Sequence, residues 1–225
     1  MSLSGVGLYT IREAARLTKA NPRELRRWLV GYKFKAANEE GSHFSAPLWE
    51  KQLDFEDAIG FHDLLEIRVV KEFVEHGVHL SVIRAALKVA KELFGADYPF
   101  TAHQFLTDGK RVFHEAVSSV NHPLTDLVAQ QLVIDNVIRP SLYAGIEYGQ
   151  RGKAERWFPI PRSRTVVLDP DLSFGAPTLA EFGIPVDTIA AAVMAEKNVG
   201  RVAQMYGIPK AAVNASLKFE QHFTA

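Results

Sequence analysis

Three arginines near the amino end of the chain give its clearest chemical signal, through both their residue type and their spacing. Arg23, Arg26 and Arg27 fall within one short predicted helix, and their spacing gathers them toward one side of it. A guanidinium group binds phosphate oxygens and, in the major groove, the edge of guanine. The pattern therefore predicts contact with DNA and favours binding over catalysis.

A helix-turn-helix over Tyr9–Tyr32 would position these arginines. A first helix is expected at Ile11–Thr18, followed by a tight corner at Lys19–Asn21. Asn21 can cap the second helix, and Pro22 suits its first position, where an N–H would lack a helical partner. The apolar residues of the second helix recur at i, i+3 and i+4: Leu25, Trp28 and Leu29. This face would hold the helix to its domain while the arginines enter a major groove.

The flanking segments are expected to add contacts with the DNA backbone. Thr10 and Arg12 would hold the start of the first helix to phosphates. Tyr32–Phe34 and His43–Trp49 are expected to pair as a hairpin, a wing beside the second helix, although an ordinary surface loop explains this segment equally well. The complete set of predicted DNA contacts is Thr10, Arg12, Asn21, Arg23, Arg26, Arg27, Lys33, Lys35 and His43.

Charge is distributed unevenly along the 225 residues. The chain holds 26 basic and 26 acidic residues, for a net charge of zero, yet residues 1–36 contain eight Lys or Arg and only two acidic residues. This imbalance favours local contact with phosphates over general adhesion to nucleic acid. The chain has no cysteine, which excludes disulfides and cysteine-based zinc sites. Without a long apolar run or a signal-peptide pattern, we expect a cytoplasmic protein with no membrane contact.

The remaining sequence predicts a mainly α fold with small β-hairpins. The Asp108-Gly109 pair indicates a hairpin turn between strands at Phe105–Thr107 and Arg111–Ala116. The expected helices lie at Phe55–His76, at Ser81–Leu93 with Ser81 as its cap, and from Pro123 onward.

A change in composition at residues 149–165, where glycine and proline alternate with arginine, predicts a domain boundary. We therefore expect a DNA-binding domain with its following helices at 1–120, a helical connector and candidate dimer interface at 121–150, and a C-terminal helical domain at 151–225.

The C-terminal domain is expected to begin with a strand at Thr165–Leu168 and to end in three short helices. These helices are predicted at Val186–Glu196, Gly200–Met205 and Pro209–Phe223, and the last two repeat the helix-turn-helix arrangement around Gly207. Their outward side offers Lys210, Asn214 and Lys218, with no arginine cluster. We therefore predict that these three residues contact a protein partner rather than DNA.

The sequence gives no indication of an enzyme, a metal site or a cofactor. Asp169-Pro170-Asp171 is typical of a turn after a strand, and the eight histidines are scattered without the spacing of a zinc site. No phosphate-binding glycine loop or nucleophile elbow is present.

The N-terminal half resembles the MerR-type winged-helix regulators. The matching stretches are Tyr9–Ile11, Glu13–Ala15, Leu17, Leu25–Trp28, Gly31-Tyr32 and Leu53–Asp57. Lys19 departs from the pattern, because glycine is usual at this corner, and the chain lacks the long terminal coiled coil of that family. The resemblance implies a winged helix-turn-helix that binds DNA as a dimer.

The C-terminal half is similar to the small domain of unknown function found in VapB-type antitoxins. The matching residues are Val166–Pro170, Gly175–Pro177, Ile184–Val186, Ala203, Tyr206–Ile208, Val213, Ala215 and Phe219. Glu181–Gly183 stands where that domain often has Gly-Thr-Arg, so the role of that arginine does not transfer.

Together the two resemblances imply the antitoxin of a type II toxin–antitoxin pair. Such a protein would neutralise a cognate toxin, commonly a PIN-like ribonuclease, and bind operator DNA as a homodimer to repress its own operon. Two alternatives remain open: a stand-alone MerR-like transcriptional regulator that senses a ligand, and a protein-interaction scaffold that does not bind DNA.

Overall fold

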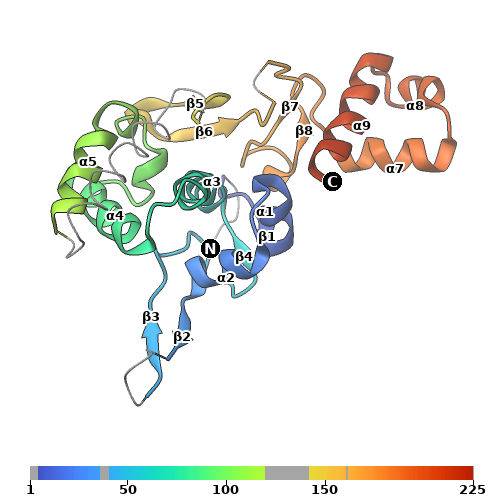
Figure 1. Cartoon of the computed structure of the whole chain (residues 1–225). Helices are drawn as coiled ribbons and strands as arrows, with labels where there is room; N and C mark the ends of the chain where they lie inside the picture. The colour runs from blue at the N-terminus through green and yellow to red at the C-terminus, as the bar shows by residue number, and fades with distance from the viewer. Residues whose placement is uncertain (1–4, 36–40, 120–141, 161, 225) are drawn as a thin grey trace.

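The computed structural model describes residues 5–35, 41–119, 142–160 and 162–224 (Figure 1). The chain is mainly helical, with small antiparallel sheets. The helical stretch expected from Pro123 and the part of the proposed connector at 121–141 lie outside the described residues. No helix in the described ranges has the length and apolar character needed to cross a membrane.

The N-terminal helices form where the sequence places them. Strand β1 (Tyr9–Thr10) leads into α1 (Ile11–Thr18), and α2 (Pro22–Val30) follows after the corner. Lys19 adopts the left-handed conformation that ends α1, with φ of 56°. Strands β2 (Tyr32–Phe34) and β3 (His43–Ser45) then pair as an antiparallel hairpin. The return strand is shorter than the predicted His43–Trp49, because Leu48 and Trp49 turn into the core.

The buried helix α3 (Phe61–Glu75) lies at the centre of the fold. It begins six residues later than the predicted helix at Phe55–His76, because Ala58–Ile59 forms strand β4, which pairs with β1. Helix α4 (Leu80–Phe94) follows, with His79 at its N-cap position instead of the predicted Ser81. A 3₁₀ turn, η1 (Pro99–Thr101), then packs against α3 and α4.

The hairpin predicted around Asp108-Gly109 is wrong. Residues Phe105–Ser119 form a single helix, α5, which packs along α4. The buried side chains of this helix recur at helical spacing: Phe105, Val112, Phe113, Ala116 and Val117. Burial of this continuous apolar face therefore outweighs the local turn preference of the Asp-Gly pair.

Two small sheets connect the N-terminal part to the C-terminal helices. Strand β5 (Ile146–Tyr148) pairs with β6 (Ala154–Trp157) around the 3₁₀ turn η2 (Gln150–Gly152), so the predicted boundary segment carries regular structure. A bridge between Trp157 and Leu168 joins β6 to the next sheet. That sheet consists of β7 (Val166–Val167), β8 (Thr178–Leu179) and β9 (Ile184–Pro185), in this order. The 3₁₀ turn η3 (Ser173–Gly175) lies in the connection between β7 and β8.

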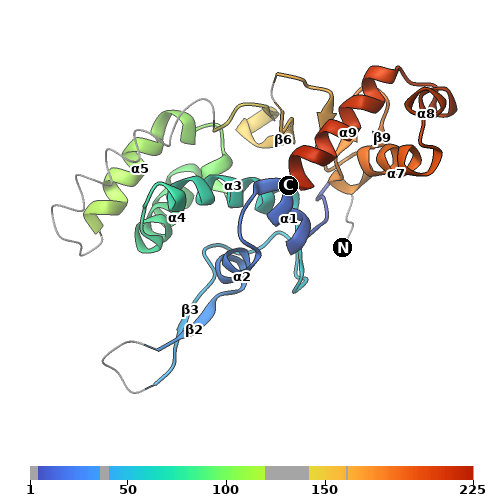
Figure 2. The same cartoon turned by 45° about the vertical axis from the view of Figure 1, so that its right-hand side comes forward.

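Three helices close the chain and pack together at one end of the molecule (Figures 1 and 2). They are α7 (Val186–Glu196), α8 (Val199–Tyr206) and α9 (Lys210–Thr224), and each bound lies within one residue of the prediction. Helix α9 also contacts α1, where Arg16 forms an ion pair with Glu220 at 2.8 Å. The buried Tyr9 hydroxyl donates a hydrogen bond to the Gly175 carbonyl at 2.7 Å, which ties the C-terminal part to the N-terminal helices.

Candidate nucleic-acid interface

Helix α2 has one buried and one exposed side, as its sequence predicts. Leu25, Trp28 and Leu29 are buried, with at most 3% of their surface exposed. Arg23, Arg26 and Arg27 are exposed on the other side. This division follows from the spacing of the apolar residues, which places the three arginines on the side of the helix that faces solvent. The α2 arginine face, meaning these three residues, is therefore available to a ligand in solution.

Two of these arginines already contact groups of the same molecule. Arg26 Nη2 lies 2.8 Å from Asp57 Oδ1, with 58% and 69% of the two side chains exposed. An ion pair this open to water is weak and can exchange for a phosphate. The guanidinium of Arg27 lies 4.5 Å from the centre of the Tyr32 ring, a cation–π contact. Arg27 therefore links α2 to the hairpin that follows it.

The β2–β3 hairpin projects away from the helices beside α2 (Figures 1 and 2). The ring centres of Tyr32 and Phe34 are 5.9 Å apart, and those of Phe34 and His43 are 5.6 Å apart. Since neighbouring side chains on a strand alternate between faces, Lys33 lies on the opposite face, paired in register with Phe44. The hairpin thus presents an aromatic row on one face and a lysine with an exposed phenylalanine on the other.

The structure places the other predicted DNA contacts at helix starts and beside the hairpin. The Thr10 hydroxyl accepts from the Glu13 N–H at 3.2 Å and donates to the Glu13 carboxylate at 2.8 Å, a capping box that starts α1. The Asn21 side chain accepts from the Arg23 N–H at 2.9 Å and caps α2. Both polar groups thus stabilise the fold, whereas Arg12 and Lys35 are exposed.

Sequence reasoning missed several residues that shape this surface. Asp57 comes from a segment far along the chain, so its pairing with Arg26 has no local signal. Tyr32, Phe34 and Phe44 were visible as aromatic residues in a predicted strand pair, and their alternation could have indicated the aromatic row. Thr10 was predicted as a phosphate contact, but its capping role was missed, although its spacing of three from Glu13 carried the signal of a capping box.

The predicted partner-binding residues share the outward face of α9. Lys210, Asn214 and Lys218, spaced by four residues, are all exposed. The other side of α9 is buried through Val213, Ser216 and Phe219. Gly207 takes the left-handed conformation at the corner between α8 and α9, with φ of 63°.

The buried carboxylates of α3 serve the fold. Asp63 accepts hydrogen bonds from the Trp49 indole N–H and from the Gln52 and Gly60 N–H groups. Glu66 accepts from the Phe100 and Thr101 N–H groups at 3.0 and 3.2 Å, and burial raises its pKa to about 8. Within the described ranges, no three His, Asp or Glu side chains gather closely enough to hold a metal ion.

The C-terminal part of the chain is similar to a known protein family. Residues 166–219 match DUF433, a family described as a protein of unknown function. The DUF433 segment runs from β7 into α9 and includes Lys210, Asn214 and Lys218. It also coincides with the stretch Val166–Phe219 whose resemblance to a small domain of unknown function was predicted.

The fold of the whole chain has a counterpart of known structure. The chain resembles the protein titled "X-ray crystal structure of Rv2018 from Mycobacterium tuberculosis", with a TM-score of 0.64 and 20% sequence identity. The similarity covers 93% of this chain and 96% of that one. At this identity it shows a shared fold and nothing about function. A comparison with curated proteins finds no match.

Proposed function

We propose that this chain is the antitoxin of a type II toxin–antitoxin pair, which binds operator DNA through its N-terminal part and a cognate toxin through its C-terminal part. The observation that carries the DNA-binding half is the exposed α2 arginine face beside a projecting hairpin. The toxin-binding half rests on the resemblance of the C-terminal sequence to antitoxins, and the DUF433 match is compatible with it.

In this proposal α1 and α2 form a MerR-like winged helix-turn-helix. Helix α2 is the recognition helix, and its arginines contact bases and phosphates in the major groove. The hairpin is the wing, and Lys33 and Lys35 contact the backbone of the duplex. Arg27, which is stacked on Tyr32, fixes the angle between the recognition helix and the wing. Such units usually act in pairs, so we propose a homodimer that binds two half-sites about one helical turn apart.

Operator binding is tested with a duplex from the promoter of the chain's own operon. Arg23→Ala combined with Arg26→Ala should weaken binding by at least about tenfold, since removing a charged hydrogen bond costs roughly 1–3 kcal/mol. The slope of log K against log salt should also fall by about 0.9 for each phosphate that the variant no longer binds. Arg111→Ala with Arg162→Ala removes the same charge from exposed positions outside the interface and should leave both values unchanged.

The two alternatives predict different results. A scaffold that does not bind DNA would fail to shift the promoter duplex at any salt concentration. If Arg23→Ala with Arg26→Ala bound the duplex with the same affinity and the same salt slope as the parent, α2 would not be part of the DNA interface. A ligand-sensing regulator would bind the duplex and have no partner encoded beside it.

Toxin binding is tested by co-expression with the adjacent gene. The proposal expects the chain to suppress the toxicity of that gene product, a PIN-like ribonuclease, and to purify with it. Lys210→Ala combined with Lys218→Ala should weaken the complex and leave DNA binding intact. An adjacent gene product that is not toxic, or a complex that forms without the DUF433 segment, would contradict this half of the proposal.

A further inference from the structure

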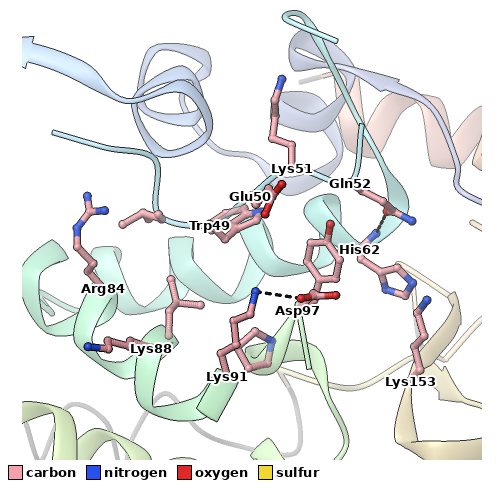
Figure 3. A pocket seen from close by; sticks show the side chains of 14 residues that line it. Trp49, Glu50, Lys51, Gln52, His62, Arg84, Lys88, Lys91, Asp97 and Lys153 are labelled. Atoms are coloured by element: carbon pink, nitrogen blue, oxygen red, sulfur yellow. Dashed lines mark hydrogen bonds and ion pairs between the residues drawn. The ribbon is translucent and has the colours of Figure 1, made fainter. Parts of the chain in front are cut away.

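A cavity of about 640 Å³ lies between α4, the start of α3 and the chain that returns from the hairpin (Figure 3). Its volume falls within the range of small-molecule sites in proteins. The lining comes from four separate parts of the chain, represented by Trp49, His62, Lys91 and Lys153. Neither the proposed DNA contacts nor the DUF433 segment contributes to it.

The walls of this cavity are held rigidly from behind. The Trp49 indole N–H donates to Asp63 at 2.9 Å, which ties the tryptophan to α3. Gln52 accepts from the His62 N–H at 3.1 Å, and its own N–H donates to Asp63 at 3.0 Å. A site whose walls are fixed before binding loses less entropy when a ligand arrives.

Arg84 holds a third wall and connects the cavity to the hairpin. Its guanidinium donates to the Pro47 carbonyl at 2.7 Å and to the Ala46 carbonyl at 2.9 Å. It also lies 3.3 Å from the Ser45 hydroxyl, at the end of β3. These contacts engage Arg84 within the fold and leave anion binding to the lysines.

The lining is strongly cationic. Five cationic residues, Lys51, Arg84, Lys88, Lys91 and Lys153, face two carboxylates, Glu50 and Asp97. Lys91 is paired with Asp97 at 3.0 Å, as Figure 3 shows, whereas Lys88 and Lys153 form no ion pair with the described part of the chain. Burial and the nearby Lys153 charge lower the pKa of His62 to about 3, so His62 is neutral and adds no charge.

Aromatic rings complete the lining. Trp49 has its polar edge occupied by Asp63, which leaves its apolar ring to line the cavity. Tyr98 stacks on His62, with 5.3 Å between ring centres and 23° between ring planes. The stacked rings of Tyr98 and His62 lie beside Lys153 (Figure 3), and this combination suits a ligand that has a planar ring and a phosphate.

We propose that this cavity binds a small phosphate-bearing molecule with a planar ring, the chemistry of a mononucleotide. Lys153 binds the phosphate, Lys88 on the opposite side of the cavity adds to its positive potential, and the Trp49 and Tyr98 rings contact the planar group. Asp97 opposes binding, because it holds Lys91 and repels the phosphate. The proposal is independent of operator and toxin binding.

The test is calorimetric titration of the full chain with adenosine and guanosine monophosphates, and with adenosine and inorganic phosphate for comparison. We expect both monophosphates to bind. Adenosine and inorganic phosphate, which each carry only one of the two recognised groups, should bind at least about tenfold more weakly, since a charged hydrogen bond contributes about 1.5–3 kcal/mol. The absence of binding by either monophosphate would overturn the proposal. So would adenosine or inorganic phosphate that binds as tightly as adenosine monophosphate.

Three variants locate the site. Lys88→Gln with Lys153→Gln changes two exposed side chains and should weaken monophosphate binding at least about tenfold. Asp97→Asn should strengthen it severalfold by freeing Lys91. Lys110→Gln on α5, an exposed lysine outside the cavity, is the matched control and should bind as the parent does.

Two results with these variants would overturn the assignment. One is unchanged monophosphate affinity in Lys88→Gln with Lys153→Gln, together with no gain in Asp97→Asn. The other is an equal loss of duplex DNA binding and monophosphate binding in the double lysine variant. That result would place these lysines in a nucleic-acid surface instead of a small-molecule site.

Discussion

Replacing Asp57 by asparagine should strengthen the binding of operator DNA. Asp57 holds Arg26 in an ion pair at 2.8 Å, with more than half of each side chain exposed. A phosphate must compete with this carboxylate for the guanidinium. Asp57→Asn removes the competitor and keeps the shape of the side chain, so Arg26 becomes available at no cost to the fold. The backbone carbonyl of Asp57, which accepts from the Ile11 N–H at 3.2 Å, is unaffected.

The size of the gain follows from the exposure of the pair. Ion pairs in water contribute about 0.2–1 kcal/mol, and release of this pair should therefore tighten binding by about 1.4- to 5-fold. Because screening weakens both interactions, the gain should shrink as salt is raised. Fluorescence anisotropy with a labelled promoter duplex at several salt concentrations measures both effects.

A double-mutant cycle separates the pair from a general change in charge. In an Arg26→Ala background, Asp57→Asn should give less gain than in the parent. Glu56→Gln removes the same charge from the adjacent exposed residue. It should give only the gain that comes from the general change in charge, and that gain should be the same with and without Arg26. The assignment of Arg26 to the DNA interface would be refuted by either of two results. One is that Asp57→Asn gives its full gain in the Arg26→Ala background, and the other is that Asp57→Asn lowers the affinity when Arg26 is present.

Three further changes test the contacts that shape the fold. Arg84→Gln removes bonds to the 45–47 segment and should lower the free energy of unfolding by about 1–3 kcal/mol in urea titrations. Tyr9→Phe leaves the Gly175 carbonyl without its donor and should cost about 1–3 kcal/mol in the same assay. Glu66 has a pKa raised from 4.5 to about 8 in the folded chain, so the folded state retains a proton that the unfolded state releases. Stability should therefore fall as pH rises from about 4.5 to about 8, and Glu66→Gln should flatten this part of the profile.

The sequence predicts elements well where the deciding interactions are local. The bounds of Ile11–Thr18 and Val186–Glu196 match the structure, because caps, corners and apolar spacing all lie within the segment. The helix at Phe105–Ser119 was missed because Asp108-Gly109 is a strong local turn signal, while the evidence for a helix lies in burial against α4. Local preference yields here to tertiary packing.

Pairing between distant segments accounts for the remaining differences. Ala58–Ile59 looks like the start of a helix, and only its partner Tyr9–Thr10 makes it a strand. The same limit applies to the candidate interface, where arginine spacing predicted the exposed face of α2 but could not reveal the carboxylate of Asp57. The cavity beside α4 was equally invisible, since its lining comes from four separated segments.

The contact between α1 and α9 changes how the basic excess of the N-terminal residues is interpreted. Arg16 is paired with Glu220, and the Lys19 ammonium lies 5.8 Å from the centre of the Phe223 ring. Two of the eight cations in that segment therefore face α9. The surface proposed to meet DNA then depends on Arg12 and the three α2 arginines, together with the hairpin lysines. A charge count from the sequence overestimates this surface, and the salt dependence of operator binding should reflect the smaller set.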